Sequence, residues 1–120
     1  MRTEVKSECG VMFKNSVLKV WANDTEKAKA LVEEYKRVFA NVEKYFEENK
    51  LGKIVDIAKT KDSHIYVVIA KRPNVNKYFH NGEWDYRCWT CWNETTQSLN
   101  YGHYDLKSYE DAMRICNKYI

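Results

Sequence analysis

The most regular pattern in the chain is a run of apolar residues at helical spacing between residues 24 and 50. They recur every three or four positions and comprise Ala28, Leu31, Val32, Tyr35, Val38, Phe39, Val42 and Phe46. Asn23, with Glu26 three positions later, resembles a capping box, and Gly52 is a favourable stop. We predict one amphipathic helix over about 24–50, with Leu31, Tyr35, Val38 and Val42 buried against a sheet.

Short apolar runs on either side of this helix predict strands. Residues 11–22 are typical of two short strands around Lys14-Asn15-Ser16, or of one strand with a bulge, and both faces are apolar. Residues 53–59 and 63–71, separated by residues 60–62, predict a hairpin. The run IYVVIA at 65–70 is apolar on both faces and is expected at the centre of the sheet. Pro73 should end that strand, because proline has no N–H to donate.

The segment KYFHNGEWDY at 77–86 has the pattern of a tight β-hairpin. Asn81-Gly82 is a pair that a two-residue type I′ turn favours, because both central residues need positive φ. This turn would place Phe79 opposite Trp84 across the hairpin. The second strand should continue through Trp92, and residues 99–106 should return as a further strand.

These elements together predict a single α+β domain over residues 1–120. We expect an antiparallel sheet of about five to six strands packed on the one long helix. Ser108, followed three positions later by Asp111, predicts the start of a short C-terminal helix over about 108–119. Either this second helix and a loop cover the other face of the sheet, or part of that face stays exposed.

The segment WDYRCWTCWN at 84–93 holds three of the four tryptophans and a C-x-x-C pair. Side chains alternate between faces along a strand, so Cys88 and Cys91 are expected to point to opposite sides. Two thiolates that bind one zinc ion must converge on it at about 2.3 Å. A redox-active pair needs a helix N-terminus to lower its thiol pKa, and no helix begins here. We expect reduced cysteines packed in a sheet, with no metal and no cofactor.

The aromatic residues of this strand suggest a binding surface. One face combines Trp89 with Asp85, Arg87 and Asn93, which prefer water to a core, and is therefore expected to be the exposed one. Exposed aromatic patches mark interaction sites, where Trp, Tyr and Arg are enriched. The residues expected to form this surface are Trp84, Arg87, Trp89, Tyr101, Tyr104 and Lys77.

Composition and charge limit the classes of function. The 120 residues suit one domain, and 20 basic against 17 acidic residues give a net charge of only +3, too weak by itself to indicate nucleic-acid binding. No apolar stretch reaches the roughly 18 residues of a membrane span, and residues 1–10 lack the apolar core of a secretory signal. We therefore expect a cytoplasmic protein with no membrane segment and with reduced thiols.

No catalytic motif is found in the sequence. It lacks a glycine-rich phosphate loop, an H-E-x-x-H pair and a nucleophile elbow. Neither His64 nor His103 has a Ser or Thr two positions later, which a paired-histidine phosphodiesterase needs. We expect a non-enzymatic protein.

Two binding functions remain. The first is a module that docks on a protein through its aromatic surface, with a homodimer as a variant, because a sheet edge or an aromatic patch is easily shared across a two-fold axis. The alternative is a nucleic-acid or nucleotide binder, in which aromatic rings stack on bases and Lys71, Arg72, Lys77 and Arg87 meet phosphates. Glu83 and other nearby carboxylates oppose that alternative, because they would repel phosphate.

No motif assigns the chain to a family. Being short, compact and rich in Lys, Asn and Tyr, it resembles small phage or mobile-element accessory proteins. Some of these inhibit host nucleases and defence systems by docking on them. The resemblance implies a host nuclease or a defence complex as the partner.

Overall fold

The computed structural model describes residues 9–14, 17–22, 25–62 and 64–120, which form an α+β fold. Its elements in chain order are β1 (Cys9–Lys14), β2 (Val17–Ala22), α1 (Thr25–Asn49), β3 (Lys53–Lys59), β4 (Ile65–Pro73), β5 (Trp84–Asn93), β6 (Ser98–Leu106), α2 (Tyr109–Cys116) and the 3-10 turn η1 (Asn117–Tyr119). The predicted long helix, the 53–59 hairpin strand and the C-terminal helix are therefore confirmed. The capping box expected at Asn23 lies outside the described residues.

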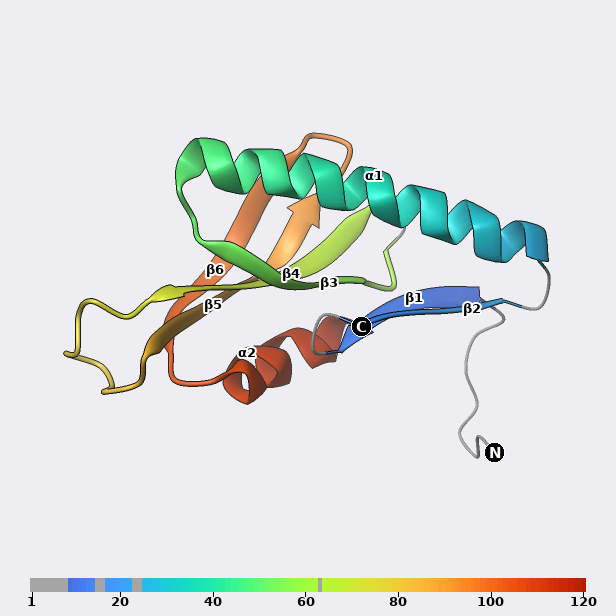
Figure 1. Ribbon diagram of the computed structural model, residues 1–120. Coiled ribbons are helices and arrows are strands. Elements are labelled where there is room, and N and C mark those ends of the chain that lie inside the picture. The colour runs from blue at the N-terminus through green and yellow to red at the C-terminus, as the bar shows by residue number, and fades with distance from the viewer. Residues whose placement is uncertain (1–8, 15–16, 23–24, 63) are drawn as a thin grey trace, which may run out of the picture.

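The main sheet has four antiparallel strands in the order β3-β4-β5-β6, so the expected number of five to six is wrong. Among the described strands β1 pairs with β2 alone, and this separate hairpin lies beside β3 under the first half of α1 (Figure 1). β3 has a register shift between Ile54 and Asp56. A bulge at an edge strand twists it away from further pairing, which explains why the ladder does not continue from β3 into β1.

Helices cover both faces of the four-stranded sheet, α1 on one side and α2 on the other (Figure 1). The core under α1 consists of Tyr35, Val38, Val42, Phe46, Ile57, Tyr66, Val68, Ala70, Trp89 and Trp92. The smaller core under α2 consists of Ala58, Val67, Ile69, Cys88, Ala112 and Cys116. β4 supplies residues to both cores, which confirms its predicted central position and the apolar character of both its faces.

The apolar stripe of α1 determines how the helix lies on the sheet. Tyr35, Val38 and Val42 are buried as predicted, whereas Leu31 is only half-buried at the edge of the cluster. At the C-terminal end Lys50 takes a left-handed conformation (φ 53°), and the Leu51 N–H donates to the Phe46 carbonyl at 3.1 Å. This is the hydrogen bond of a Schellman motif, so α1 ends at Asn49, and Lys50 takes the left-handed position that was expected two residues later, at Gly52.

Gly52 follows this motif and is needed where the chain turns into β3. Its φ of +117° is a conformation that other residues rarely adopt, and a Cβ here would lie 2.8 Å from the Lys71 carbonyl oxygen. The glycine therefore allows β3 to run directly beside β4.

α2 begins as the sequence predicts. The Ser108 hydroxyl accepts a hydrogen bond from the Asp111 N–H at 3.2 Å, which is the N-cap contact. None of the helices in the described ranges combines the length and apolarity needed to cross a bilayer.

The fold predicts unequal costs for two neighbouring substitutions on α1. Val42 is fully buried against the sheet, so Val42→Ala should lower the free energy of unfolding by about 1.5–3 kcal/mol through lost burial and a residual cavity. The adjacent Glu43 is exposed, and Glu43→Ala should change it by less than about 0.5 kcal/mol. Urea denaturation of both variants measures the difference, and equal effects would contradict the helix orientation.

Candidate functional site

A register shift in β5 decides which way its aromatic residues face. Tyr66 pairs with Trp92 and Val68 with Trp89, so the single residue between them on β4 faces two residues of β5, Thr90 and Cys91. This is a β-bulge, and it interrupts the alternation of side chains. Trp89 and Trp92 therefore both pack in the core under α1, although three positions separate them. The strict alternation expected along 84–93 fails at this point.

Trp89 is part of the core, so its expected exposure is wrong. Only 3% of it is accessible, and its ring lies edge-to-face against Phe46 of α1 at 5.2 Å and against Tyr104 at 5.7 Å. Its indole N–H donates to the Tyr104 hydroxyl at 3.2 Å. A Cβ at Gly102 would collide with that hydroxyl, so the glycine makes room for the two rings.

Asp85 and Arg87, which were expected to face water, are also buried, at 3% and 6% exposure. One oxygen of the Asp85 carboxylate accepts from Arg87 Nη2 at 3.1 Å and from Arg72 Nε at 3.2 Å. Its other oxygen accepts the backbone N–H of Asp105 at 3.0 Å. The Asp85 carboxylate and the Arg87 guanidinium form an ion pair inside the protein, so their burial could not be predicted from their hydrophilic side chains.

The remaining residues of the expected surface do not form one patch. Tyr101 and Tyr104 are exposed as predicted, at 74% and 51%. The Tyr104 ring also lies 5.0 Å from the Arg87 guanidinium, which it helps to cover. Trp84 is half-buried with the Lys71 ammonium 4.3 Å from its ring centroid. Lys77 lies elsewhere, in the loop between β4 and β5.

That loop replaces the expected tight turn. β4 ends at Pro73 as predicted, and Pro73 pairs with Trp84, so residues 74–83 connect the two strands. Neither Asn81 nor Gly82 has a positive φ, and Phe79 pairs with no strand, so the type I′ turn is wrong. The Asn74 side chain explains this outcome, because its interactions hold a wider loop.

Asn74 is 94% buried and organises the loop from inside. Its backbone N–H donates to the Glu83 carbonyl at 2.9 Å, which closes the base of the loop. Its side-chain amide donates to the carbonyls of His80 at 3.1 Å and Gly82 at 2.9 Å. The Lys77 ammonium also donates to the Gly82 carbonyl, at 2.8 Å. These bonds give a loop without regular secondary structure a defined shape.

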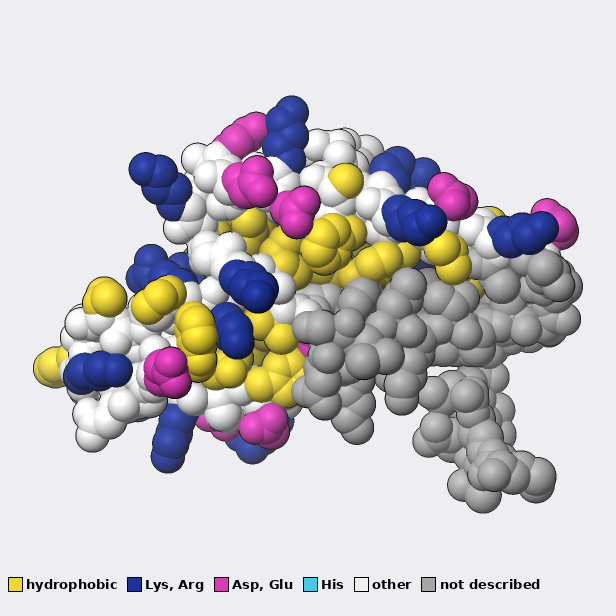
Figure 2. Space-filling view, viewed as in Figure 1, with side chains coloured by type: hydrophobic (Ala, Val, Ile, Leu, Met, Phe, Trp, Pro, Cys, Tyr) yellow, Lys and Arg dark blue, Asp and Glu magenta, His cyan; other side chains and the backbone are white. Residues whose placement is uncertain are grey.

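The tip of this loop presents apolar side chains to solvent. Val75, Tyr78 and Phe79 are 88%, 83% and 63% exposed, and the two rings contact each other edge-to-face at 5.0 Å. Figure 1 shows the loop extending beyond the end of the sheet, and Figure 2 shows apolar side chains at the same end of the molecule. We call Val75, Tyr78 and Phe79 the loop tip. Sequence reasoning missed it because Tyr78 and Phe79 were assigned to a hairpin strand.

Three cysteines, Cys88, Cys91 and Cys116, lie on the side of the sheet opposite α1. Cys88 and Cys116 are buried together under α2, and the hydrogen bond with Cys88, together with burial, raises the pKa of the Cys116 thiol. Cys91 lines a cavity that η1 also lines, so its expected orientation away from Cys88 is wrong. Burial and the nearby charge of Asp62 raise the pKa of Cys91. Within the described ranges no three His, Cys, Asp or Glu side chains are grouped so as to hold a metal ion.

The burial of Trp89 gives a prediction that separates it from Tyr101. Trp89→Ala should cost about 3–5 kcal/mol of unfolding free energy, because it removes a packed ring from the core. Tyr101→Ala should change stability by about 0.5 kcal/mol or less, since the ring is exposed. Chemical denaturation followed by circular dichroism measures both. A small loss of unfolding free energy in Trp89→Ala would contradict the burial of Trp89 and favour the exposed surface predicted from the sequence.

The role of Asn74 is tested by hydrogen exchange. Asn74→Ala removes both side-chain bonds to the loop carbonyls, so amide exchange across residues 75–83 should accelerate while exchange in α1 stays unchanged. The exposed Asn81 gives a matched control, and Asn81→Ala should leave the loop protected. Exchange measured by mass spectrometry reads both segments. Identical loop exchange in the two variants would show that Asn74 does not hold the loop.

Comparison with known proteins places this arrangement in a family. No curated protein matches the chain, and no solved structure matches it. A family model, described as large polyvalent protein associated domain 24, matches residues 37–110. The match runs from within α1 to the start of α2 and includes the whole four-stranded sheet, the loop and its tip. The chain belongs to the family of large polyvalent protein associated domain 24.

Proposed function

We propose that this domain is a non-enzymatic module that docks on a protein partner through the loop tip. The observation that supports this most directly is the exposure of Val75, Tyr78 and Phe79 on a loop that is hydrogen-bonded into one shape. Exposed apolar side chains gathered at one site are typical of interaction surfaces. Tyrosine and other aromatic residues frequently dominate the binding energy of such surfaces.

The order of the loop strengthens the proposal. A flexible loop must be ordered when it binds, and that loss of conformational freedom weakens affinity. Here the buried Asn74 amide and the Lys77 ammonium fix the loop backbone before any partner arrives. The tip can therefore insert into a partner with little further ordering of its backbone.

A protein partner fits this end of the molecule better than nucleic acid does. The cations expected to meet phosphates already have partners within the domain: Arg72 and Arg87 bind Asp85, and Lys71 covers Trp84. Lys77 donates to a loop carbonyl. Phosphate binding at this surface would have to compete with these contacts. An apolar partner surface would leave all of them in place.

The surroundings of the tip define the chemistry of the partner. Arg72, Lys77 and Lys107 are exposed near the loop, with Glu83 as the exposed carboxylate of the loop itself. An apolar pocket with an acidic residue at its border would complement the tip and the exposed Lys107 beside it. The family description links the domain to large polyvalent proteins, which agrees with a role in association. As source of the partner we propose a host nuclease or defence complex, inhibited by covering its surface.

The double variant Tyr78→Ala/Phe79→Ala tests the proposal. Truncation of aromatic anchors typically costs about 2 kcal/mol or more, so affinity for a captured partner should fall by about thirtyfold or more. Tyr119→Ala is a matched control, because Tyr119 is equally an exposed tyrosine but lies on η1. Partners are captured from nuclease-treated host lysate, and their affinities are then measured with purified protein at two salt concentrations.

Capture of a protein supports the proposal only if the double variant binds it more weakly than Tyr119→Ala does. A partner that both variants bind equally would show that docking uses another surface. Binding that disappears after nuclease treatment, or that falls steeply with salt, would favour the nucleic-acid alternative. A tip-dependent increase in mass of the purified domain would identify a second copy of the chain as the occupant in place of a different protein.

A further inference from the structure

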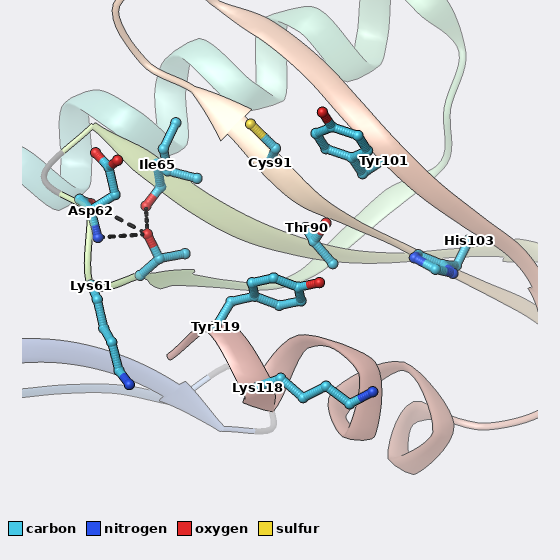
Figure 3. Close-up of a pocket in the computed structure, with 10 residues that line it drawn as sticks. Lys61, Asp62, Ile65, Thr90, Cys91, Tyr101, His103, Lys118 and Tyr119 are labelled. Atoms are coloured by element: carbon cyan, nitrogen blue, oxygen red, sulfur yellow. Dashed lines mark hydrogen bonds between the residues drawn. The ribbon is translucent and has the colours of Figure 1, made fainter.

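A cavity of about 560 Å³ lies between the sheet and η1, away from both the loop tip and α1 (Figure 3). Its walls come from five parts of the chain: the β3–β4 connection, the first residue of β4, the bulge of β5, the middle of β6, and η1. Small-molecule sites commonly occupy roughly 300–1,000 Å³ and are mainly apolar with a few polar groups. This cavity has the size and the mixed walls of such a site.

Two tyrosine rings border the cavity from opposite elements. Tyr101 reaches it from β6 and Tyr119 from η1, and the two are 74% and 47% exposed. Tyr101 has a positive φ of 58°, a conformation disfavoured for a tyrosine and found most often where neighbouring structure or function requires it. Exposed rings at the mouth of a cavity offer planar faces on which an aromatic ligand can stack.

The charged groups of the cavity are separated. In Figure 3, Lys118 and His103 lie on one side of the Tyr119 ring, whereas Asp62 and Lys61 lie on the other. Lys118 is an exposed residue of η1, and its ammonium forms no ion pair with any residue of the described ranges. One carboxylate oxygen of Asp62 accepts a hydrogen bond from the His64 N–H at 3.2 Å. After burial, the negative charge of Asp62 is the second cause that raises the pKa of Cys91, which also lines the cavity.

We propose that this cavity binds a nucleoside phosphate. The phosphate would lie near Lys118 and His103, which can donate charged or neutral hydrogen bonds to it. The base would stack on Tyr119 and Tyr101, and its exocyclic amino group would donate to Asp62. A bare anion would leave the rings unused, and a neutral aromatic would leave Lys118 unused. The same chemistry is offered by a free nucleotide and by the terminal nucleotide of a single strand.

The proposal is tested by isothermal titration with AMP, adenosine and inorganic phosphate. AMP should bind, and adenosine and phosphate should each bind at least tenfold more weakly, because each lacks half of the recognised groups. UMP should bind more weakly than AMP, since uracil has no exocyclic amino group for Asp62. A single-stranded oligodeoxyadenylate, titrated in parallel, distinguishes a strand end from a free nucleotide by which of the two binds more tightly.

Variants connect any binding to the cavity. Lys118→Ala and Tyr119→Ala should each weaken AMP at least about tenfold, and Tyr119→Phe should retain most of the affinity because it keeps the ring. Lys107→Ala and Tyr78→Ala make the same chemical changes outside the cavity and should have no effect. Since Tyr78 belongs to the loop tip and Tyr119 to the cavity, failure of this proposal is distinguishable from failure of the docking proposal. Unfolding midpoints confirm that each variant folds.

Several results would overturn the proposal. Adenosine binding as tightly as AMP would remove the phosphate from recognition, and phosphate binding as tightly as AMP would remove the base. Oligonucleotide or AMP binding that survives both Lys118→Ala and Tyr119→Ala would place the site elsewhere. The absence of binding by AMP, CMP, GMP and the oligonucleotide at millimolar concentration would exclude this ligand class.

Discussion

The carboxylate of Asp85 joins three strands at the end of the sheet from which the β4–β5 loop extends. It accepts hydrogen bonds from Arg72 on β4, from Arg87 on its own strand and from the backbone of Asp105 on β6. A buried carboxylate without such partners would cost several kcal/mol, so these elements are held in one relative position. Pro73 and Trp84, which bracket the loop, are the pair next to Arg72 and Asp85, so the loop starts from a fixed base.

The bulge at Thr90 and Cys91 has the corresponding role at the other end of β5. It turns Trp92 to the same side as Trp89, so that two indole rings fill the core under α1. It also brings two consecutive residues to the wall of the cavity on the opposite side. Bulges frequently redirect side chains next to functional sites. One irregularity in one strand thus completes the main core and shapes the cavity.

The sequence predicted the elements well and their surroundings poorly. The long helix, the central strand IYVVIA and the Ser108 cap follow from local patterns of period and capping, and all three are confirmed. The errors concern Asn81-Gly82, Cys91 and the exposure of Trp89. Each depends on a side-chain contact or a strand register that periodicity does not reveal: the bonds of Asn74 within the loop, the register of β5 on β4, and the pairing of Arg87 with Asp85. Residue type alone does not indicate that a charged side chain has a buried partner.

Apolar side chains are exposed at the loop tip, whereas those of the two core clusters are buried. Val75, Tyr78 and Phe79 belong to neither core cluster, and they are mainly exposed, so they add little to the stability of the isolated domain. Exposed apolar side chains also favour aggregation, which is a cost to a free protein. A two-residue turn at Asn81-Gly82 would have placed Tyr78 and Phe79 in a strand. The hydrogen bonds of Asn74 instead hold a wider loop, on which these side chains face solvent. In the docking proposal an interaction with a partner offsets that cost, and a prearranged loop strengthens such an interaction because little conformational freedom is lost on binding.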